Sequence, residues 1–291
     1  MDTSGGARAS GRAEEFNDHV YIRGRRLDLA SLVSPRLFDP AYRSELRRQL
    51  RSAKPFPHLV VDDWFDPGLL QLIYEEFEPS AREHWRVIRD EHQYFHRSDG
   101  HEAFGHASQI YFSLVNSGWF VALLGEIIDV DDLISDPTLA GGGLHETRTG
   151  GKFAVHRDFD KHVVYGLENK MVFITYLNKG WQPEWGAALE LWKGDTSECV
   201  RKIVPELGRS VLLLHGPDSF HGHPEPMQSP EDRPRRSVAS YYYRNARGVQ
   251  ERMTRKTSVF LKAYRAKRLR HIVTRITPPI LLDAFKKIVG G

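Results

Sequence analysis

The pattern of apolar and polar residues changes near Gly141. Before that point, apolar residues recur at helical spacing, as Leu46 and Leu50 do in PAYRSELRRQLRS. In DPGLLQLIYEEFE, Asp66 and Pro67 have the form of an N-cap and a first helical residue. HLVVDDWF predicts a short strand between these two helices, and VNSGWFVALLGEIIDVDDLI predicts a further apolar helix.

After Gly141 the apolar runs are short and are bounded by Gly, Pro, Asn and Asp, which is typical of an antiparallel β-sandwich or barrel. Helices do not alternate with these runs, so a parallel βαβ fold is not expected. We therefore predict an α+β fold, in which N-terminal helices pack outside a jelly-roll core. The runs are GGKFAVHRDF, MVFITYLN, ALELW, RSVLLLH and SVASYYYR.

Residues 84–112 hold five histidines among charged and aromatic residues, without a clean period. We expect a polar loop near the mouth of a pocket, and a second metal region is the alternative. The spacing of the histidines matches no compact ligand set, which favours the loop. The histidines in question are His84, His92, His96, His101 and His106.

Residues 251–291 contain eleven Lys or Arg and only two acidic residues. Their apolar residues fall at helical intervals, and Pro278 and Pro279 interrupt the pattern, so two basic amphipathic helices are predicted. Such helices can pack across a barrel or lie on an anionic membrane surface. The apolar residues of the first helix are Leu261, Tyr264, Leu269, Ile272, Val273 and Ile276.

The composition is that of a globular protein, because 40% of the 291 residues are hydrophobic and 11% are aromatic. Cys199 is the single cysteine, which excludes an intrachain disulfide and a cysteine-based zinc site. No apolar run approaches the roughly 18 to 20 residues of a membrane-spanning helix, and the N-terminus does not resemble a secretory signal. We expect a cytoplasmic protein, with peripheral membrane contact through the tail as an alternative.

The stretch HRDFD offers two metal ligands from one strand end. Residues i and i+2 of a strand point to the same side, so His156 and Asp158 can face one point while Arg157 faces away. Two histidines and one carboxylate, with open positions left on the metal, form the ligand set of many iron(II) oxygenases. A second histidine is therefore required.

The second histidine is expected in LLLHGPDSFHGHPEP, directly after an apolar strand. His221 is the first choice, because a turn at SFHG allows the chain to fold back towards the first two ligands. His223 is the alternative, and His215, which ends the strand, is expected in the core.

An anion holder is expected in RPRRSVASYYYR. Strand alternation puts Arg235 and Ser237 on one face with Ala239 and Tyr241. A buried guanidinium binds a carboxylate through two hydrogen bonds, to which a neighbouring hydroxyl can add a third. Strand parity favours Arg235 over the adjacent Arg236, which stays the alternative.

In VFITYLN, the same alternation puts Tyr176 on one face with Val172 and Ile174. The order HRD, TYLNKGWQPEWGAALELW, PELGRSVLLLHGPDSFHGHPEP and RRSVASYYYR, over residues 55–245, resembles the iron(II)- and 2-oxoglutarate-dependent dioxygenases of the prolyl 4-hydroxylase type. These relatives commonly have Gly-Gly-Glu-Leu where this chain has Gly-Ala-Ala-Leu at residues 186–189. That difference affects a local turn and no expected ligand.

The resemblance implies a double-stranded β-helix in which His156, Asp158 and His221 bind Fe²⁺. It also implies that Arg235 and Tyr176 hold the far carboxylate of 2-oxoglutarate, with Ser237 beside them. Such an enzyme hydroxylates an unactivated C–H bond, consumes O₂ and decarboxylates 2-oxoglutarate to succinate, and ascorbate can support it. The predicted domains are a flexible lead-in (1–35), the dioxygenase domain (36–250) and the helical tail (251–291).

The resemblance suggests a prolyl or peptide substrate or a small-molecule group, and the tail suggests a membrane-associated saccharide or lipid-linked intermediate. A non-catalytic, cupin-like metal-binding protein is the alternative of another class, but it gives no reason for Arg235 and Tyr176 to accompany the metal ligands. Nucleic acid is not an expected partner, because the basic tail lacks interleaved aromatic residues.

Overall fold

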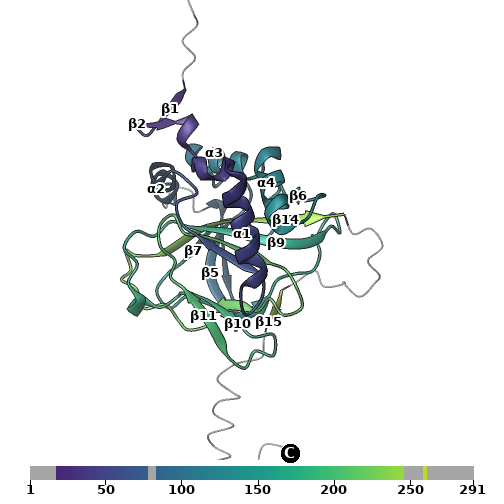
Figure 1. Cartoon of the computed structure of the whole chain (residues 1–291). Coiled ribbons are helices and arrows are strands. Elements are labelled where there is room, and N and C mark those ends of the chain that lie inside the picture. Colours follow the sequence, from purple (N-terminus) through teal and green to yellow (C-terminus); the bar gives the residue numbers. More distant parts are fainter. Residues whose placement is uncertain (1–17, 78–82, 246–257, 261–291) are drawn as a thin grey trace, which may run out of the picture.

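The computed structural model describes residues 18–77, 83–245 and 258–260. A curled, mainly antiparallel sheet forms its body, and the helices gather against one side of that sheet (Figure 1). The α-helices are α1 (Pro40–Ser52), α2 (Pro67–Glu75), α3 (His106–Val115) and α4 (Gly118–Ile128). Short 3-10 helices are η1 (Leu29–Ser31), η2 (Pro35–Phe38) and η4 (Pro183–Trp185).

Short polar side chains begin the helices. The Asp66 carboxylate accepts a hydrogen bond from the backbone N–H of Leu69 at 2.8 Å, which confirms the predicted N-cap of α2. Gly105 has no side chain with which to cap α3, and the buried Glu76 takes over that function. Its carboxylate accepts from the N–H groups of Ala107 and Ser108, at 2.7 and 2.8 Å, and so joins the end of α2 to the start of α3.

Thirteen of the described strands form one sheet in the order β11-β10-β13-β8-β5-β7-β14-β9-β12-β3, with β4 beside β5, β6 beside β14 and β15 beside β8. β1 and β2 form a separate hairpin. The strands are β1 (His19–Ile22), β2 (Arg25–Asp28), β3 (His58–Val61), β4 (Trp85–Arg89), β5 (Gln93–Ser98), β6 (Ile134–Ser135), β7 (Gly143–Thr147), β8 (Lys152–Arg157), β9 (Glu168–Tyr176), β10 (Leu189–Trp192), β11 (Cys199–Ile203), β12 (Ser210–Leu214), β13 (His221–His223), β14 (Arg235–Arg244) and β15 (Val259–Phe260).

Strand alternation separates two apolar cores, as β9 illustrates. Met171 and Phe173 pack against the helices, where the Phe173 ring lies 5.7 Å from that of Trp64. Val172 and Tyr176 point to the other side, into the interior of the curled sheet. The predicted α+β fold with a jelly-roll core and flanking N-terminal helices is therefore confirmed. The predicted helical tail lies outside the described residues, apart from residues 258–260.

Two segments differ from their predicted form. The described part of the predicted lead-in carries the hairpin β1–β2, with Ile22 and Leu27 buried, so regular structure begins before residue 35. The predicted polar loop at residues 84–112 is the hairpin β4–β5 followed by α3. β5 gains its stability from pairing with β7 and β8, which lie far away in sequence, and local periodicity does not reveal such pairing.

Within the described residues, no single helix is long and apolar enough to cross a membrane, and α3 and α4 reach that length only as a pair bent by 50°.

Candidate metal centre and anion pocket

Three buried donor side chains meet where β13 pairs with β8. His156 lies in β8, Asp158 follows the end of that strand, and His221 is the first residue of β13, directly opposite His156. One donor atom from each residue lies within 4.8 Å of the others. The structure therefore brings the three predicted ligand residues together. It places His221 in a strand and not in the predicted turn, because β13 continues the sheet between β8 and β10.

The two histidines are held so that one ring nitrogen of each faces the cluster. Nδ1 of His156 lies 2.9 Å from the carbonyl oxygen of Ala154, and Nδ1 of His221 lies 3.0 Å from that of Ser219. A carbonyl accepts only, so Nδ1 carries the proton and donates it, which leaves the lone pair on Nε2. These Nε2 atoms lie 3.4 and 3.8 Å from the carboxylate oxygens of Asp158. Such backbone acceptors are typical of metal-binding histidines.

The electrostatics of the cluster favour the protonation states that bind a metal. Burial acts to raise the pKa of Asp158, but the imidazoles of His221 and His156 outweigh it and lower the pKa below its usual value. Burial also lowers the pKa of His221 to about 4, although Asp158 opposes that shift. At neutral pH the carboxylate is therefore charged and the His221 imidazole is neutral. Two histidines and one carboxylate form a donor set that fits iron(II).

A glycine makes the pairing of β13 with β8 possible. The register moves from His221 opposite His156 to His223 opposite Phe153, so β8 carries an extra residue, a β-bulge. Gly222 lies against this bulge, and a Cβ atom there would come within 2.8 Å of the carbonyl oxygens of Phe153 and Ala154. A residue with a side chain at this position would push β13, and His221 with it, away from β8.

A buried arginine and its neighbours form a candidate anion pocket in the same interior. Arg235 opens β14 and is buried with Tyr176 of β9; its Nη2 donates to the phenol oxygen at 3.2 Å, and its Nε donates to the carbonyl of Ala187 at 3.0 Å. Burial lowers the pKa of Arg235, and Tyr176 opposes this shift. Ser237 pairs directly with Tyr176 across the two strands. The structure thus brings together the three residues predicted to hold a carboxylate.

At residues 186–189 this chain has Gly-Ala-Ala-Leu in place of the Gly-Gly-Glu-Leu noted above, and the segment still forms a turn. Gly186 and Ala187 both have positive φ angles, of 73° and 53°. This conformation turns the carbonyl of Ala187 towards Arg235. The alanine therefore takes part in orienting the guanidinium.

Residues 142–243 match the family model of the 2OG-Fe(II) oxygenase superfamily. This range includes the metal cluster and the anion pocket. These residues form a 2OG-Fe(II) oxygenase domain. The predicted resemblance to these dioxygenases is thereby confirmed, as is the prediction of an oxygenase enzyme.

The fold of this oxygenase domain is shared by a solved prolyl-4-hydroxylase structure. A prolyl-4-hydroxylase from Pseudomonas putida is 15% identical, with 70% of this chain and 100% of that chain covered and a TM-score of 0.51. A prolyl hydroxylase from Trichoplax adhaerens, in complex with a hypoxia inducible factor oxygen degradation domain peptide fragment, is 13% identical, with 72% and 94% covered and a TM-score of 0.49. A comparison with curated proteins finds no match.

The alternatives raised by the sequence occupy other positions in the oxygenase domain. Arg236 points to the opposite face of β14, where it forms an ion pair with Glu146 at 2.8 Å and donates to the carbonyl of Tyr74. His215 pairs with Asp160 at 2.9 Å and is not one of the three clustered donors. His223 is buried one position beyond Gly222 and is not one of the three clustered donors.

Two residues of the oxygenase interior were not predicted, Arg97 of β5 and His145 of β7. They lie opposite each other across the two strands, and His145 in turn lies opposite Ser237. Phe260, within the predicted tail, is a third such residue: it pairs opposite His156, and its ring centroid lies 5.5 Å from that of the histidine. Strand alternation could have placed His145 on the inner face, had the register with β14 been known.

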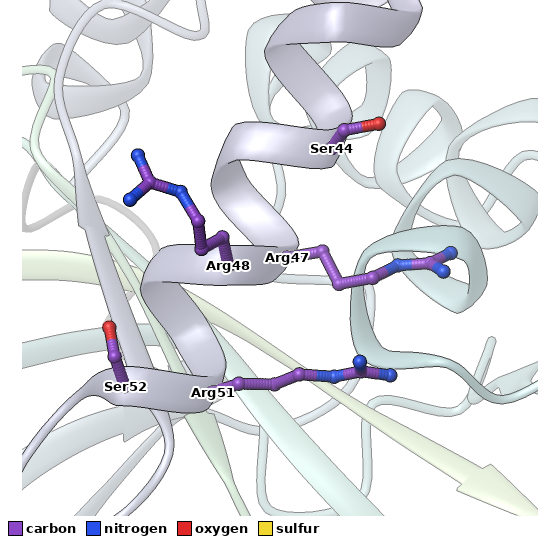
Figure 2. A pocket seen from close by; sticks show the side chains of 5 residues that line it. All are labelled: Ser44, Arg47, Arg48, Arg51 and Ser52. Carbon is purple, nitrogen blue, oxygen red and sulfur yellow. The ribbon is translucent and has the colours of Figure 1, made fainter.

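A shallow hollow on α1 offers no comparable chemistry (Figure 2). Arg47 and Arg51 form ion pairs with Asp129, at 3.6 and 2.8 Å, and Arg48 pairs with Glu45. These two carboxylates offset two of the three positive charges that the hollow presents. Its lining consists of Ser44, Arg47, Arg48, Arg51 and Ser52.

Replacement of Gly222 tests the geometry of the oxygenase metal cluster. Gly222→Ala is expected to lower the free energy of unfolding by about 1–3 kcal/mol, because the methyl group must displace two backbone carbonyls. It is also expected to weaken Fe²⁺ or Mn²⁺ binding by roughly tenfold, since His221 moves with β13. Denaturant titration and metal titration measure the two effects. Gly216→Ala, at a position with open space around it, is the matched control; equal effects of both substitutions would contradict this account.

Proposed function

We propose that the protein is an Fe(II)- and 2-oxoglutarate-dependent hydroxylase, in which His156, Asp158 and His221 hold the iron. Arg235, Tyr176 and Ser237 hold the distal carboxylate of 2-oxoglutarate. The observation that carries this proposal is the presence, in one interior, of a converging His-Asp-His donor set and a buried arginine. The guanidinium of Arg235 contacts only a phenol and a carbonyl among the described residues, so its charge is left for an anion.

The residues of the site have separate roles in this proposal. Iron and 2-oxoglutarate, when bound, would activate O₂, so that 2-oxoglutarate is decarboxylated to succinate and an unactivated C–H bond is hydroxylated. His156 and His221 present neutral imidazoles, and Asp158 presents a negative charge. Arg235 and Tyr176 orient the dicarboxylate through hydrogen bonds that are strong in this buried setting. The apolar side chains around them, such as Leu191, exclude water.

We propose that the dioxygenase domain spans residues 36–250. For its substrate, we propose a prolyl residue of a peptide or a small-molecule group. The likeness to prolyl hydroxylases supports the fold, and the identity of the substrate rests on direct measurement. Succinate release, screened over proline-containing peptides, free amino acids and sugar derivatives with iron and ascorbate, would identify the class. Ascorbate is proposed only as a reductant that supports turnover. If 2-oxoglutarate binds but none of these compounds increases succinate release, the proposed substrate classes are contradicted.

The metal ligands are tested by single substitutions. His156→Ala, Asp158→Ala and His221→Ala are each expected to abolish iron-dependent succinate formation and to weaken metal binding at least roughly 100-fold, because each removes one of three protein donors. His223→Ala is the matched control for the distal histidine and is expected to keep metal binding within a few-fold. Loss of metal in His223→Ala, with retention in His221→Ala, would transfer the ligand role to His223.

The anion pocket is tested by the adjacent arginines of β14. Arg235→Met is expected to raise the KM for 2-oxoglutarate by roughly 10- to 100-fold, because a charge-assisted, two-point contact is lost. Arg236→Met removes the ion pair with Glu146 and is expected to change stability while leaving this KM within about threefold. Steady-state kinetics and denaturant titration measure both variants. A larger rise in KM for Arg236→Met than for Arg235→Met would reverse the assignment.

A second candidate function rests on the basic residues of 251–291. In it, a cytoplasmic, membrane-peripheral enzyme hydroxylates a membrane-associated saccharide or a lipid-linked intermediate. Cosedimentation with anionic vesicles tests it. Replacing Arg265, Lys267, Arg268 and Arg270 by Gln is expected to weaken vesicle binding by roughly two to three orders of magnitude at low salt, because each of the four basic residues near an anionic surface contributes about 1 kcal/mol. Equal binding of the variant and the unchanged protein would remove the membrane candidate.

A further inference from the structure

A second arginine faces the interior of the oxygenase domain from the hairpin β4–β5. Arg97 lies opposite His145, His145 lies opposite Ser237, and Ser237 lies opposite Tyr176. Residues directly opposite each other in antiparallel strands point to the same face of the sheet. Arg97 therefore shares the inner face with the residues proposed to hold 2-oxoglutarate, but it lies two strands away from β14.

The guanidinium of Arg97 has no partner among the described residues. Its Nε atom is buried without a hydrogen bond, and no ion pair to a described acid neutralises its charge. Arg86, its direct neighbour across the hairpin, differs in this respect: it is exposed and forms an ion pair with Asp99 at 2.7 Å. An unpaired guanidinium inside a protein is costly unless a ligand completes it.

The inner face continues from Arg97 towards the metal cluster. Tyr241 lies on the same face of β14 as Ser237, whose neighbour across the strands is His145, the partner of Arg97. The ring of Tyr241 lies 4.8 Å from that of Phe159, the residue next to Asp158. Arg97 and Tyr241 are only half-buried, whereas Arg235 and Tyr176 are closed off from solvent. Arg97 is therefore more accessible to an arriving substrate than Arg235.

The charges of the site leave Arg97 unbalanced. Under the proposed function, a divalent metal and Arg235 contribute three positive charges, and Asp158 and 2-oxoglutarate contribute three negative ones. The neighbouring imidazole adds none, because burial, with Arg97 and Arg235, lowers the pKa of His145 to about 4. Arg97 then carries one positive charge that neither the chain's described residues nor the cosubstrate offsets.

We infer that Arg97 binds an anionic group of the substrate, a carboxylate or a phosphate, and so positions the C–H bond near the metal. This inference rests on the proposed function, which supplies the metal and 2-oxoglutarate beside it. It predicts that the substrate is an acid, such as a carboxylic acid or a phosphate ester, and not an uncharged compound. A planar guanidinium can hold either group through two hydrogen bonds, which fixes orientation as well as position.

The experiment compares acids with their amides on the full chain loaded with Zn²⁺ and 2-oxoglutarate. Ligand-observed NMR gives the Kd of N-acetylproline and its amide, and of benzoate and benzamide. The unchanged protein is expected to bind each acid at least roughly tenfold more tightly than its amide, as a charge-assisted contact implies. Arg97→Met is expected to lose this preference, Arg97→Lys to keep part of it, and Arg86→Met, the matched control on the same hairpin, to keep it fully.

The outcomes separate this inference from the function on which it rests. Failure of 2-oxoglutarate to bind the metal-loaded, unchanged protein contradicts the proposed function. Normal 2-oxoglutarate binding with no preference for acids, or with a preference that survives Arg97→Met, overturns the role of Arg97 alone. A tenfold or greater loss of 2-oxoglutarate affinity in Arg97→Met also overturns it, because Arg97 would then belong to the cosubstrate pocket. Thermal melting of each variant confirms that it is folded.

Discussion

The pairing of β13 with β8 is the contact on which the site depends. It places His221 opposite His156 and next to Asp158, although 65 residues separate the two histidines in the sequence. The pairing requires an extra residue in β8 and a residue without a side chain at position 222, because backbone carbonyls fill the space that a Cβ would need. Since the strands are buried on the inner face, small shifts in this register would separate the donors and leave polar groups unpaired.

Strand alternation organises the rest of the interior in the same way. In β14, Arg235 points inwards to Tyr176, while Arg236 points outwards to Glu146. The two arginines therefore have different surroundings, although they are adjacent and chemically identical. A one-residue slip of β14 would exchange them, and its long pairing with β9 opposes such a slip.

Burial controls the charges within this interior. It keeps His221 and His145 neutral at neutral pH, and it leaves the guanidinium groups of Arg235 and Arg97 as the positive charges on the inner face that no described acid neutralises. Arg235 is enclosed and suits a cosubstrate of constant shape. Arg97, in β5, is less buried than Arg235 and, under the inference above, suits a group that varies from one substrate to another.

The sequence by itself determined the features that depend on local contacts or on alternation. The N-cap at Asp66, the strands around residues 152–157 and 168–176, and the inward direction of Arg235 beside the outward direction of Arg236 all follow from residues close together in the chain. Only the tertiary structure decided that residues 84–112 form a hairpin, that His221 begins a strand, and that Arg97 and His145 face the site. These features depend on pairing between strands far apart in sequence, where register, and not composition, selects the face to which a side chain points.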